Sequence, residues 1–310
     1  MIDTELMVLA GVLAFIFGWN NSSLLIGNIR ASGSFGTRGA VALAVVGLLA
    51  GVVVAGSEML KSLDGSLAPS SPEAGLVATF VISIALTAGL TLLKLPATFS
   101  GIMVGSFLGA ATALHLTVNV NQVLLVVSFW FLAPLISGVI AFVLRKATSS
   151  LLIGLSLVGV DSFNRLAILG TSLAVAFVLG ANNIGLIAGT ALGGASSGGV
   201  PLAAGLALVA ALGAALLGKD HVSDTVGDKM LSLSPQGVFS VFAGAAIAVM
   251  AGTQLHIPLS IGESVLGGMF GAAYSQRTTV INRRVATVTL GMWLVTPLLA
   301  LLAAFVMAAA

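Results

Sequence analysis

Ten long apolar runs constrain the fold of this sequence more than any other feature. A bilayer core of about 30 Å is crossed by a helix of about 20 apolar residues. The runs cover residues 7–28, 39–57, 75–93, 96–115, 122–144, 166–189, 200–218, 236–255, 258–276 and 286–308. The strands of a membrane barrel need only about ten alternating residues. The runs therefore predict an all-α integral membrane protein with about ten transmembrane segments.

The composition excludes the soluble classes of protein. Only 7% of the 310 residues are charged and 58% are hydrophobic, whereas soluble domains carry about 25% charged residues. A cytosolic enzyme, a nucleic-acid binder and a soluble binding module are excluded. The chain has no cysteine and only three histidines, far apart in sequence, so we expect no metal site and no cofactor. The acidic N-terminus does not resemble a cleavable signal, and the first run should persist as a span.

The basic residues are distributed unevenly among the expected loops. Eleven of the 12 fall on one side, in the loops that carry Arg30 and Arg38, Lys94, residues 145–165, 219–229 and 277–284; Lys61 is the exception. Basic loops mark the cytoplasmic side. We therefore expect a multi-pass protein of the plasma membrane, surrounded by lipid, with both termini outside.

The chain also repeats itself at an offset of about 162 residues. Gly18-Trp19-Asn20-Asn21 aligns with Gly180-Ala181-Asn182-Asn183, and Trp130 and Pro134 align with Trp293 and Pro297 after one inserted residue. We divide the chain into a first repeat (1–146), a cytoplasmic linker (147–165) and a second repeat (166–310). Five segments in each repeat is an odd number, so the second repeat must be inverted. Inverted repeats are typical of secondary transporters, although channels contain them as well.

Two adjacent asparagines occur within an apolar run of each repeat, at Asn20-Asn21 and Asn182-Asn183. Buried amides are costly unless they are hydrogen-bonded, and asparagine competes with the helical backbone for hydrogen bonds. With the flanking glycines, the pairs predict a helix break whose free N–H groups and positive half-helix end bind an anion. Alternatively, these amides only join neighbouring helices.

A proline followed by hydroxyl residues forms the second paired motif, Pro96-Ala97-Thr98-Phe99-Ser100 and Pro258-Leu259-Ser260, with Ser264 one turn later. This pattern predicts a helix N-terminus, where hydroxyls either cap the backbone or face a ligand. Together the motifs predict a polar chamber of neutral donors that suits a tetrahedral oxyanion. The candidate substrate-binding residues are Asn20, Asn21, Ser22, Ser23, Thr98, Ser100, Asn182, Asn183, Ser260 and Ser264.

Glu263 is the one acidic residue well inside an expected span. Intramembrane carboxyls are usually functional, so we expect Glu263 to carry a coupling proton; a structural, hydrogen-bonded glutamate is the alternative.

The two motifs together resemble the inorganic phosphate transporter (PiT) family over nearly the whole chain. Family members carry a duplicated Gly-Ala-Asn-Asp-x-x-Asn signature and a Pro-x-Ser-Thr-Thr-type signature. By resemblance, the first signature falls on Gly18, Asn20 and Asn21 and on Gly180, Asn182 and Asn183; the second falls on Thr98, Ser100, Ser260 and Ser264. The resemblance implies a transporter of phosphate or sulfate, coupled to sodium or protons, and is compatible with a homodimer.

The family aspartates are replaced in this chain by Asn21 and Asn183. By resemblance those aspartates help to bind sodium, and an amide brings no negative charge, so proton coupling is favoured over sodium. The loss of aspartates is similar to the bacterial sulfate permease branch. A site without carboxylates also has less means to prefer monohydrogen phosphate over sulfate. We therefore expect a proton-coupled, alternating-access permease that favours sulfate. A sodium-coupled phosphate transporter and an anion channel are the alternatives. No enzyme motif is present, so we expect no catalytic residues.

Overall fold

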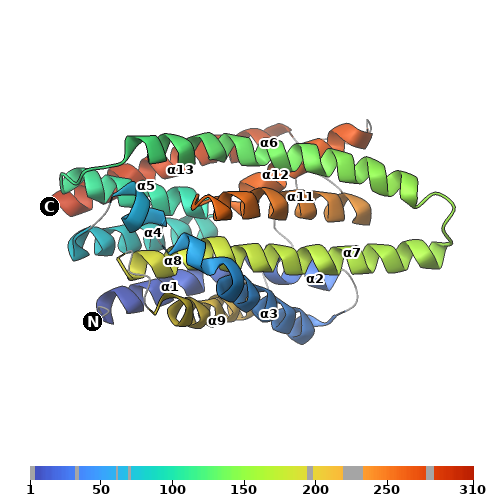
Figure 1. The fold of residues 1–310 in the computed structure, drawn as a ribbon, viewed down its shortest axis with the longest axis horizontal. Helices are drawn as coiled ribbons and strands as arrows, with labels where there is room; N and C mark the ends of the chain where they lie inside the picture. The colour runs from blue at the N-terminus through green and yellow to red at the C-terminus, as the bar shows by residue number, and fades with distance from the viewer. Residues whose placement is uncertain are drawn as a thin grey trace.

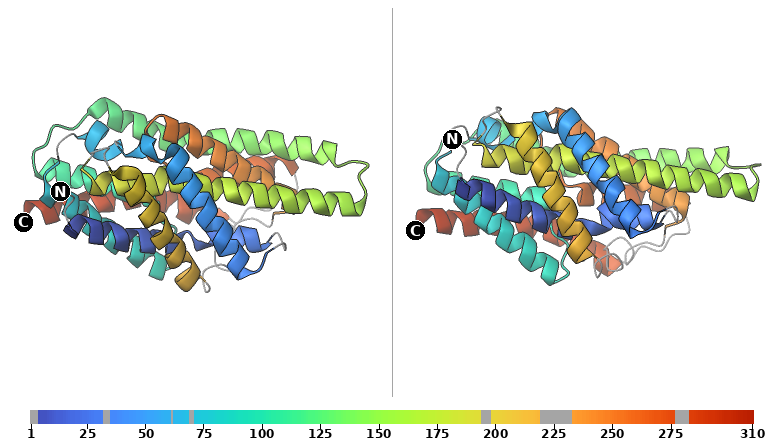
Figure 2. Two further views of the ribbon diagram at one scale, coloured as in Figure 1. Left: turned by 60° about the horizontal axis from the view of Figure 1, so that its bottom comes forward. Right: turned by 90° about the horizontal axis from the view of Figure 1, so that it is seen from below.

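The computed structural model describes residues 4–31, 35–60, 62–68, 71–193, 198–218, 233–276 and 283–310. These residues are almost entirely helical and contain no strand, which confirms the all-helical expectation. Most of the helices run roughly along the long axis of the molecule, while α3 and α9 are strongly tilted (Figures 1 and 2). The expected loop at 219–229 lies outside the described residues.

The helices of the first half are long apolar rods separated by short irregular turns. They are α1 (Thr4–Asn20), a π-helical turn (Ser23–Gly27), α2 (Asn28–Ala31), α3 (Thr37–Ala55), a 3₁₀ turn (Gly56–Met59), a second π-helical turn (Ser62–Leu67), α4 (Glu73–Leu92), α5 (Phe99–Ala113) and α6 (Val120–Leu151).

The second half repeats this order with a continuous first helix. Its elements are α7 (Leu157–Val178), a π-helical segment (Leu179–Ile184), α8 (Gly185–Ala191), α9 (Gly199–Leu217), α11 (Pro235–Gln254), α12 (Ile261–Gln276) and α13 (Arg283–Ala309). Because α6 ends at Leu151 and α7 begins at Leu157, most of the expected linker 147–165 is helical. The α6–α7 hairpin extends beyond the other helices (Figure 1).

Seven helical stretches within the described residues are long and apolar enough to cross a membrane. They are Thr37–Met59, Glu73–Leu92, Val120–Leu151, Leu157–Ala191, Gly199–Leu217, Pro235–Gln254 and Ala286–Ala309. The expected segments 7–28, 96–115 and 258–276 contain α1, α5 and α12, which have only 17, 15 and 16 residues. A helix of 15 residues is about 22 Å long, so α5 does not cross a bilayer core by itself.

Two helical hairpins occupy opposite halves of the long axis. The α4–α5 hairpin lies in the half that holds both chain termini, and the α11–α12 hairpin lies in the other half (Figure 1). The turn that carries Lys94 joins α4 to α5, and its residues Leu93, Lys94 and Leu95 are exposed. Hydropathy detects both arms of a hairpin but does not show at what depth the chain turns.

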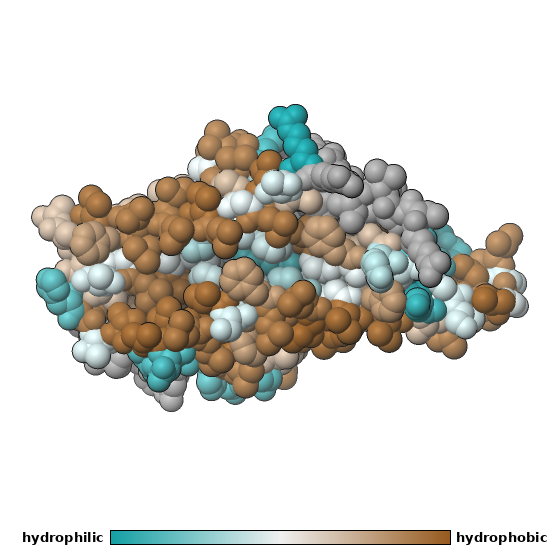
Figure 3. Space-filling view, turned by 90° about the horizontal axis from the view of Figure 1, so that it is seen from above, coloured by the Kyte–Doolittle hydropathy of each residue, from teal (hydrophilic) through white to brown (hydrophobic). Residues whose placement is uncertain are grey.

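The outer surface matches a lipid environment. The face shown in Figure 3 is largely apolar. Large aliphatic and aromatic side chains are exposed on α6, including Phe131, Leu135 and Val139, and on α13, including Leu298 and Leu302. In water such a surface would be costly; in a bilayer it faces lipid chains.

Glycines allow close helix contacts, and these contacts recur at the repeat spacing of 162 residues. A Cβ on Gly18 would lie 1.8 Å from the carbonyl oxygen of Ala210, and one on Gly180 would lie 2.2 Å from that of Leu48. The reverse contacts, from α9 to α1 and from α3 to α7, place Gly213 on Phe15 and Gly51 on Phe177. The first helix of each half thus packs backbone to backbone on the second helix of the other half.

The last helices pair in the same crossed manner. Gly105 and Gly109 of α5 approach the carbonyl oxygens of Pro297 and Leu301 in α13, while Gly267 and Gly271 of α12 approach those of Pro134 and Gly138 in α6. Small residues permit such close approach where lipid supplies no hydrophobic drive for helix association.

Candidate functional site

The first asparagine pair lies where α1 stops. Asn20 ends the helix, and its amide nitrogen donates to the Thr91 hydroxyl of α4 at 2.8 Å. The Asn21 amide donates to the Phe17 carbonyl at 3.0 Å. The chain then resumes as a π-helical turn at Ser23–Gly27. The regular α-helix is therefore interrupted at Asn20-Asn21, although helical hydrogen bonding continues from Leu25 N–H to the Asn21 carbonyl.

The second asparagine pair lies within an unbroken helical stretch. Residues Leu179–Ile184 are π-helical and connect α7 directly to α8. The expected break with freed backbone N–H groups is therefore wrong for Asn182-Asn183. A π-helix keeps its hydrogen bonds within the chain and often marks a functional site.

The Asn182 amide is fully used. Its nitrogen donates to the Thr253 hydroxyl at 2.9 Å and to the Ile257 carbonyl at 3.1 Å, and its oxygen accepts from the Leu259 N–H at 3.1 Å. An amide has two N–H donors, so none remains for a ligand. Asn182 therefore holds the turn before α12 and is not free to bind an anion in this conformation. The neighbouring Asn183 is buried, and its side-chain oxygen has no partner among the described residues.

The hydroxyl residues lie at the starts of α5 and α12, as their motif predicts. Thr98 is the N-cap of α5, and its side chain accepts from Gly101 N–H at 3.2 Å. The hydroxyls of Ser100 and Ser264 are fully buried and have no hydrogen-bond partner within the described chain. Ser260, also buried, precedes α12 and accepts through its carbonyl from the Ser264 N–H.

Three contacts join these pieces. The Thr98 side chain lies beside the Glu263 carboxyl, which places the starts of α5 and α12 near each other. The rings of Phe17 and Phe99 are 4.6 Å apart, which places the end of α1 against the start of α5. The Asn182 amide holds the turn that leads to α12. The structure thus brings both asparagine motifs and both hydroxyl motifs towards one region.

Two expected residues are placed differently. The side chain of Ser22 lies against Gly218 at the end of α9, where a glycine Cβ would come within 2.4 Å of the Ser22 Cβ. Ser23 is half-buried in the π-helical turn.

The region offers donors and little fixed charge. Its hydrogen-bonding groups are hydroxyls, amides and the N-terminal ends of α5 and α12, whose backbone dipoles favour an anion. Glu263, which is buried, is the one ionisable member of the candidate set. Such a site can surround an oxyanion with hydrogen bonds.

The sequence interpretation missed three supporting residues. Thr91 and Thr253 hold Asn20 and Asn182, and both follow their asparagine by 71 positions. The Trp130 indole donates to the Pro258 carbonyl at 3.3 Å. The equal spacing of the two threonines within the repeat was a signal that could have identified them.

A family model described as "Phosphate transporter family" matches residues 17–156 and again 155–304. The chain belongs to this family. The two matches follow each other along the chain and together cover nearly all of it. Members of this family are transporters, not enzymes, and with the apolar helices this makes the chain a multi-pass membrane transporter of an inorganic anion.

Individual proteins similar to the chain are also named as phosphate or sulfate transporters. The chain is 27% identical to "Sulfate permease CysP" of Bacillus subtilis, over 95% of this chain and 85% of the relative. It is also 27% identical to "Putative phosphate permease MJ0630" of Methanocaldococcus jannaschii, over 97% and 95%. A solved sodium-dependent phosphate transporter has a similar fold, with a TM-score of 0.81, 19% identity and coverage of 98% of this chain and 97% of that one. The resemblance to this family is confirmed.

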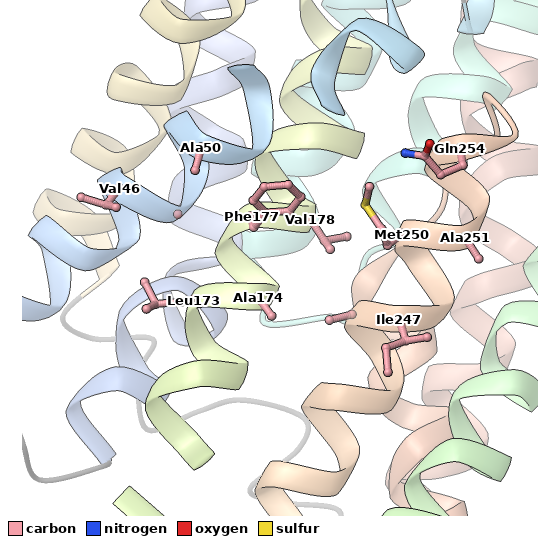
Figure 4. Close-up of a pocket in the computed structure, with 12 residues that line it drawn as sticks. Val46, Ala50, Leu173, Ala174, Phe177, Val178, Ile247, Met250, Ala251 and Gln254 are labelled. Atoms are coloured by element: carbon pink, nitrogen blue, oxygen red, sulfur yellow. The ribbon is translucent and has the colours of Figure 1, made fainter. Parts of the chain in front are cut away.

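The structure also contains an apolar pocket (Figure 4). It has a volume of about 640 Å³ and is bounded by α3, α7 and α11, through residues such as Ala50, Phe177 and Met250. Gln254 is the one polar side chain in its lining. A pocket with so few donors does not suit the anion that a phosphate transporter family member carries.

Proposed function

We propose that this protein is a proton-coupled permease of the plasma membrane that carries sulfate in preference to phosphate. The observation that carries this proposal is a pair of fully buried hydroxyls, Ser100 in the first turn of α5 and Ser264 in the first turn of α12, which have no hydrogen-bond partner among the described residues. Buried polar groups usually have partners. An oxyanion between the helix starts would supply acceptors to both hydroxyls.

The selectivity for sulfate follows from the shortage of acceptors. Sulfate is fully deprotonated near neutral pH and only accepts hydrogen bonds, whereas monohydrogen phosphate also presents a proton. At the signature positions, Asn21 and Asn183 stand where the family has aspartates. The candidate substrate contacts are therefore Asn20, Asn21, Asn183, Thr98, Ser100, Ser260 and Ser264, with Asn182 contributing only after its present bonds open.

Glu263 is the proposed proton carrier. Its carboxyl is buried and lies beside the Thr98 side chain, near the starts of both α5 and α12. A protonated glutamate beside the anion reduces the net charge that crosses the membrane. Its partner position in the first repeat is Gly101, so the coupling site occurs once per chain.

Alternating access would use the two halves of the chain. The crossed glycine contacts at matched positions support two inverted repeats of five segments, 1–146 and 166–310, joined by 147–165. Exchange of conformation between such repeats moves the opening from one side to the other. We also propose that both termini face outwards, at the same end of the molecule (Figure 1). A homodimer is compatible with this arrangement.

Uptake into proteoliposomes tests the proposal. Radiolabelled sulfate should accumulate when the vesicle interior is alkaline, and excess unlabelled sulfate should compete better than phosphate. Glu263→Gln should abolish accumulation driven by the pH gradient while sparing sulfate exchange. Glu5→Gln, which changes an exposed glutamate on α1, is the matched control and should transport normally. Absence of uptake of both anions refutes the proposal, and unchanged accumulation by Glu263→Gln removes Glu263 from the mechanism.

One observation favours sodium-coupled phosphate transport as the second candidate. The buried Asn183 oxygen has no partner among the described residues and could contribute to binding a cation. The solved structure of similar fold is a sodium-dependent phosphate transporter. Uptake of phosphate driven by a sodium gradient at equal pH, with no response to a pH gradient, would establish this alternative.

A further inference from the structure

Two equivalent turns are held very differently. The first gate loop, residues 93–97, joins α4 to α5, and the second gate loop, residues 255–259, joins α11 to α12. Their backbones match: Lys94 and His256 have φ of 55° and 58°, and the next residue in each loop donates to the carbonyl five residues earlier at 2.9 Å. The two turns therefore share one local fold and differ in what surrounds them.

Side chains of neighbouring segments hold the second gate loop through hydrogen bonds to its backbone groups. Asn182 bonds to the Ile257 carbonyl and the Leu259 N–H, and Trp130 donates to the Pro258 carbonyl. The His256 carbonyl accepts a hydrogen bond from the Ser62 hydroxyl. The His256 Nδ1 lies 3.4 Å from a carboxylate oxygen of Glu58. The loop residues Ile257 and Leu259 are consequently 0% and 1% exposed.

Among the described residues, the first gate loop lacks counterparts of the bonds that Asn182 and Trp130 make to the second gate loop. Asn20 bonds to Thr91 and to its neighbour Asn21, and within the described residues it makes no bond to Leu95 or Ala97. Trp293, the counterpart of Trp130, makes no such bond to Pro96 among those residues either. Leu95 is 37% exposed, against 0% for its counterpart Ile257.

We propose that the two gate loops dock alternately, with Asn182 and Trp130 closing the second and Asn20 and Trp293 closing the first. In the other state, the Asn20 amide bonds to the Leu95 carbonyl and the Ala97 N–H, Trp293 donates to the Pro96 carbonyl, and the second gate loop is released. Asn20 has the required capacity, because Thr91 takes only one of its two N–H donors. This inference rests on the proposed alternating access and names the contacts that exchange.

Cysteine labelling tests the proposal, since the native chain contains no cysteine. Leu95→Cys and Ile257→Cys are made separately, and the rate of reaction with a water-soluble maleimide is measured in detergent without any anion. Position 95 should react at least about tenfold faster than position 257. Equal rates, or a faster rate at 257, would show that the loops do not differ in solution.

A second substitution then tests the coupling between the loops. Trp130→Phe removes one indole donor and should raise labelling at 257 and lower it at 95, each by about three- to tenfold, the equivalent of one hydrogen bond. Trp293→Phe is the matched control. It removes a bond that exists only in the other state, so labelling at 257 should not rise and labelling at 95 should not fall.

Opposite changes in labelling at positions 257 and 95 distinguish alternate docking of the two loops from a loosening of the second gate loop alone. If Trp130→Phe raises labelling at 257 while labelling at 95 stays constant, the loops are independent and the proposal is wrong. If Trp130→Phe does not elute as a folded protein, His256→Ala removes the contact with Glu58 and should produce the same reciprocal shift. Because no anion is present, reciprocal labelling in a protein that fails to take up sulfate or phosphate would refute the cargo and leave the gate mechanism intact.

Discussion

The crossed packing of the two halves predicts a large difference between two similar substitutions on one helical stretch. Gly180→Ala places a methyl group 2.2 Å from the Leu48 carbonyl oxygen, which belongs to the α3 backbone. Contacts shorter than 3.0 Å are essentially never observed for a Cβ, so α3 must move away by about 0.8 Å. The reverse contact, from Gly51 to Phe177, lies between the same two segments and would also be disturbed.

The cost can be estimated from overpacking. Extra methyl groups in well-packed interiors typically cost about 1–3 kcal/mol, and here a backbone group rather than a side chain must yield. Gly170→Ala on α7 is the matched control, because its methyl group would meet nothing within 4 Å. Alanine there gains up to about 1 kcal/mol of helix propensity. The free energies of unfolding of the two variants should therefore differ by about 2–4 kcal/mol.

Thermal unfolding in detergent, followed by tryptophan fluorescence, measures this difference. Gly180→Ala should unfold about 5–10 °C below Gly170→Ala, from the usual conversion of free energy into midpoint temperature. Equal midpoints for the two variants would show that the α3–α7 contact is not close-packed, and the crossed arrangement of the halves would lose its main support.

Two further predictions concern the polar contacts. Thr253→Val removes the hydroxyl acceptor of the fully buried Asn182 amide, leaving the Ile257 carbonyl as its other oxygen acceptor, and should destabilise the protein by about 1–3 kcal/mol. Thr112→Val, at an exposed hydroxyl bonded within its own helix, should have little effect on the same melting curve. Arg145 is buried and donates to Ser149, Ser234 and Gln236, and the Gln276 amide also accepts from it when its oxygen faces the guanidinium. Arg145→Lys should therefore lower the unfolding midpoint, because an ammonium group cannot replace five fixed donors. Lys146→Arg, the control, should leave the midpoint unchanged.

The sequence predicts the helices well because apolar runs of about 20 residues have few alternatives in a membrane. It also predicts the repeat, and glycines at matched positions of the two halves prove to lie directly against the backbone of the other half. The depth of the α4–α5 turn was not predictable in this way. Residues 75–93 and 96–115 are apolar throughout, so a hairpin and two crossing helices have the same hydropathy. What separates them is the burial of almost every residue of α5 against its neighbours.

The asparagine motifs show the same limit at the level of single side chains. The sequence indicates that paired amides in an apolar helix need partners, and Asn182 does have three. Whether those partners are a ligand or the protein depends on distances across 71–77 positions of sequence. The helix remains intact at Asn182 because the local chain forms a π-helical segment. An Asn-Asn pair is compatible both with such a segment and with a true break, so the sequence alone does not distinguish the two.

Alternate docking of the two gate loops explains why uncharged side chains, rather than charged ones, suit the residues that hold these loops in a transporter. Three hydrogen bonds hold the second gate loop through Asn182 and Trp130, each with a net value of about 0.5–1.5 kcal/mol. Alone, they would favour the closed loop by roughly 2–4 kcal/mol, and the gate would open rarely. If three equivalent bonds form at the first gate loop when these break, the two states differ little in free energy. A repeat that carries the same donors and acceptors in both halves therefore keeps both states populated, because the partly exposed contact of His256 with Glu58 on one side adds only a weak bias.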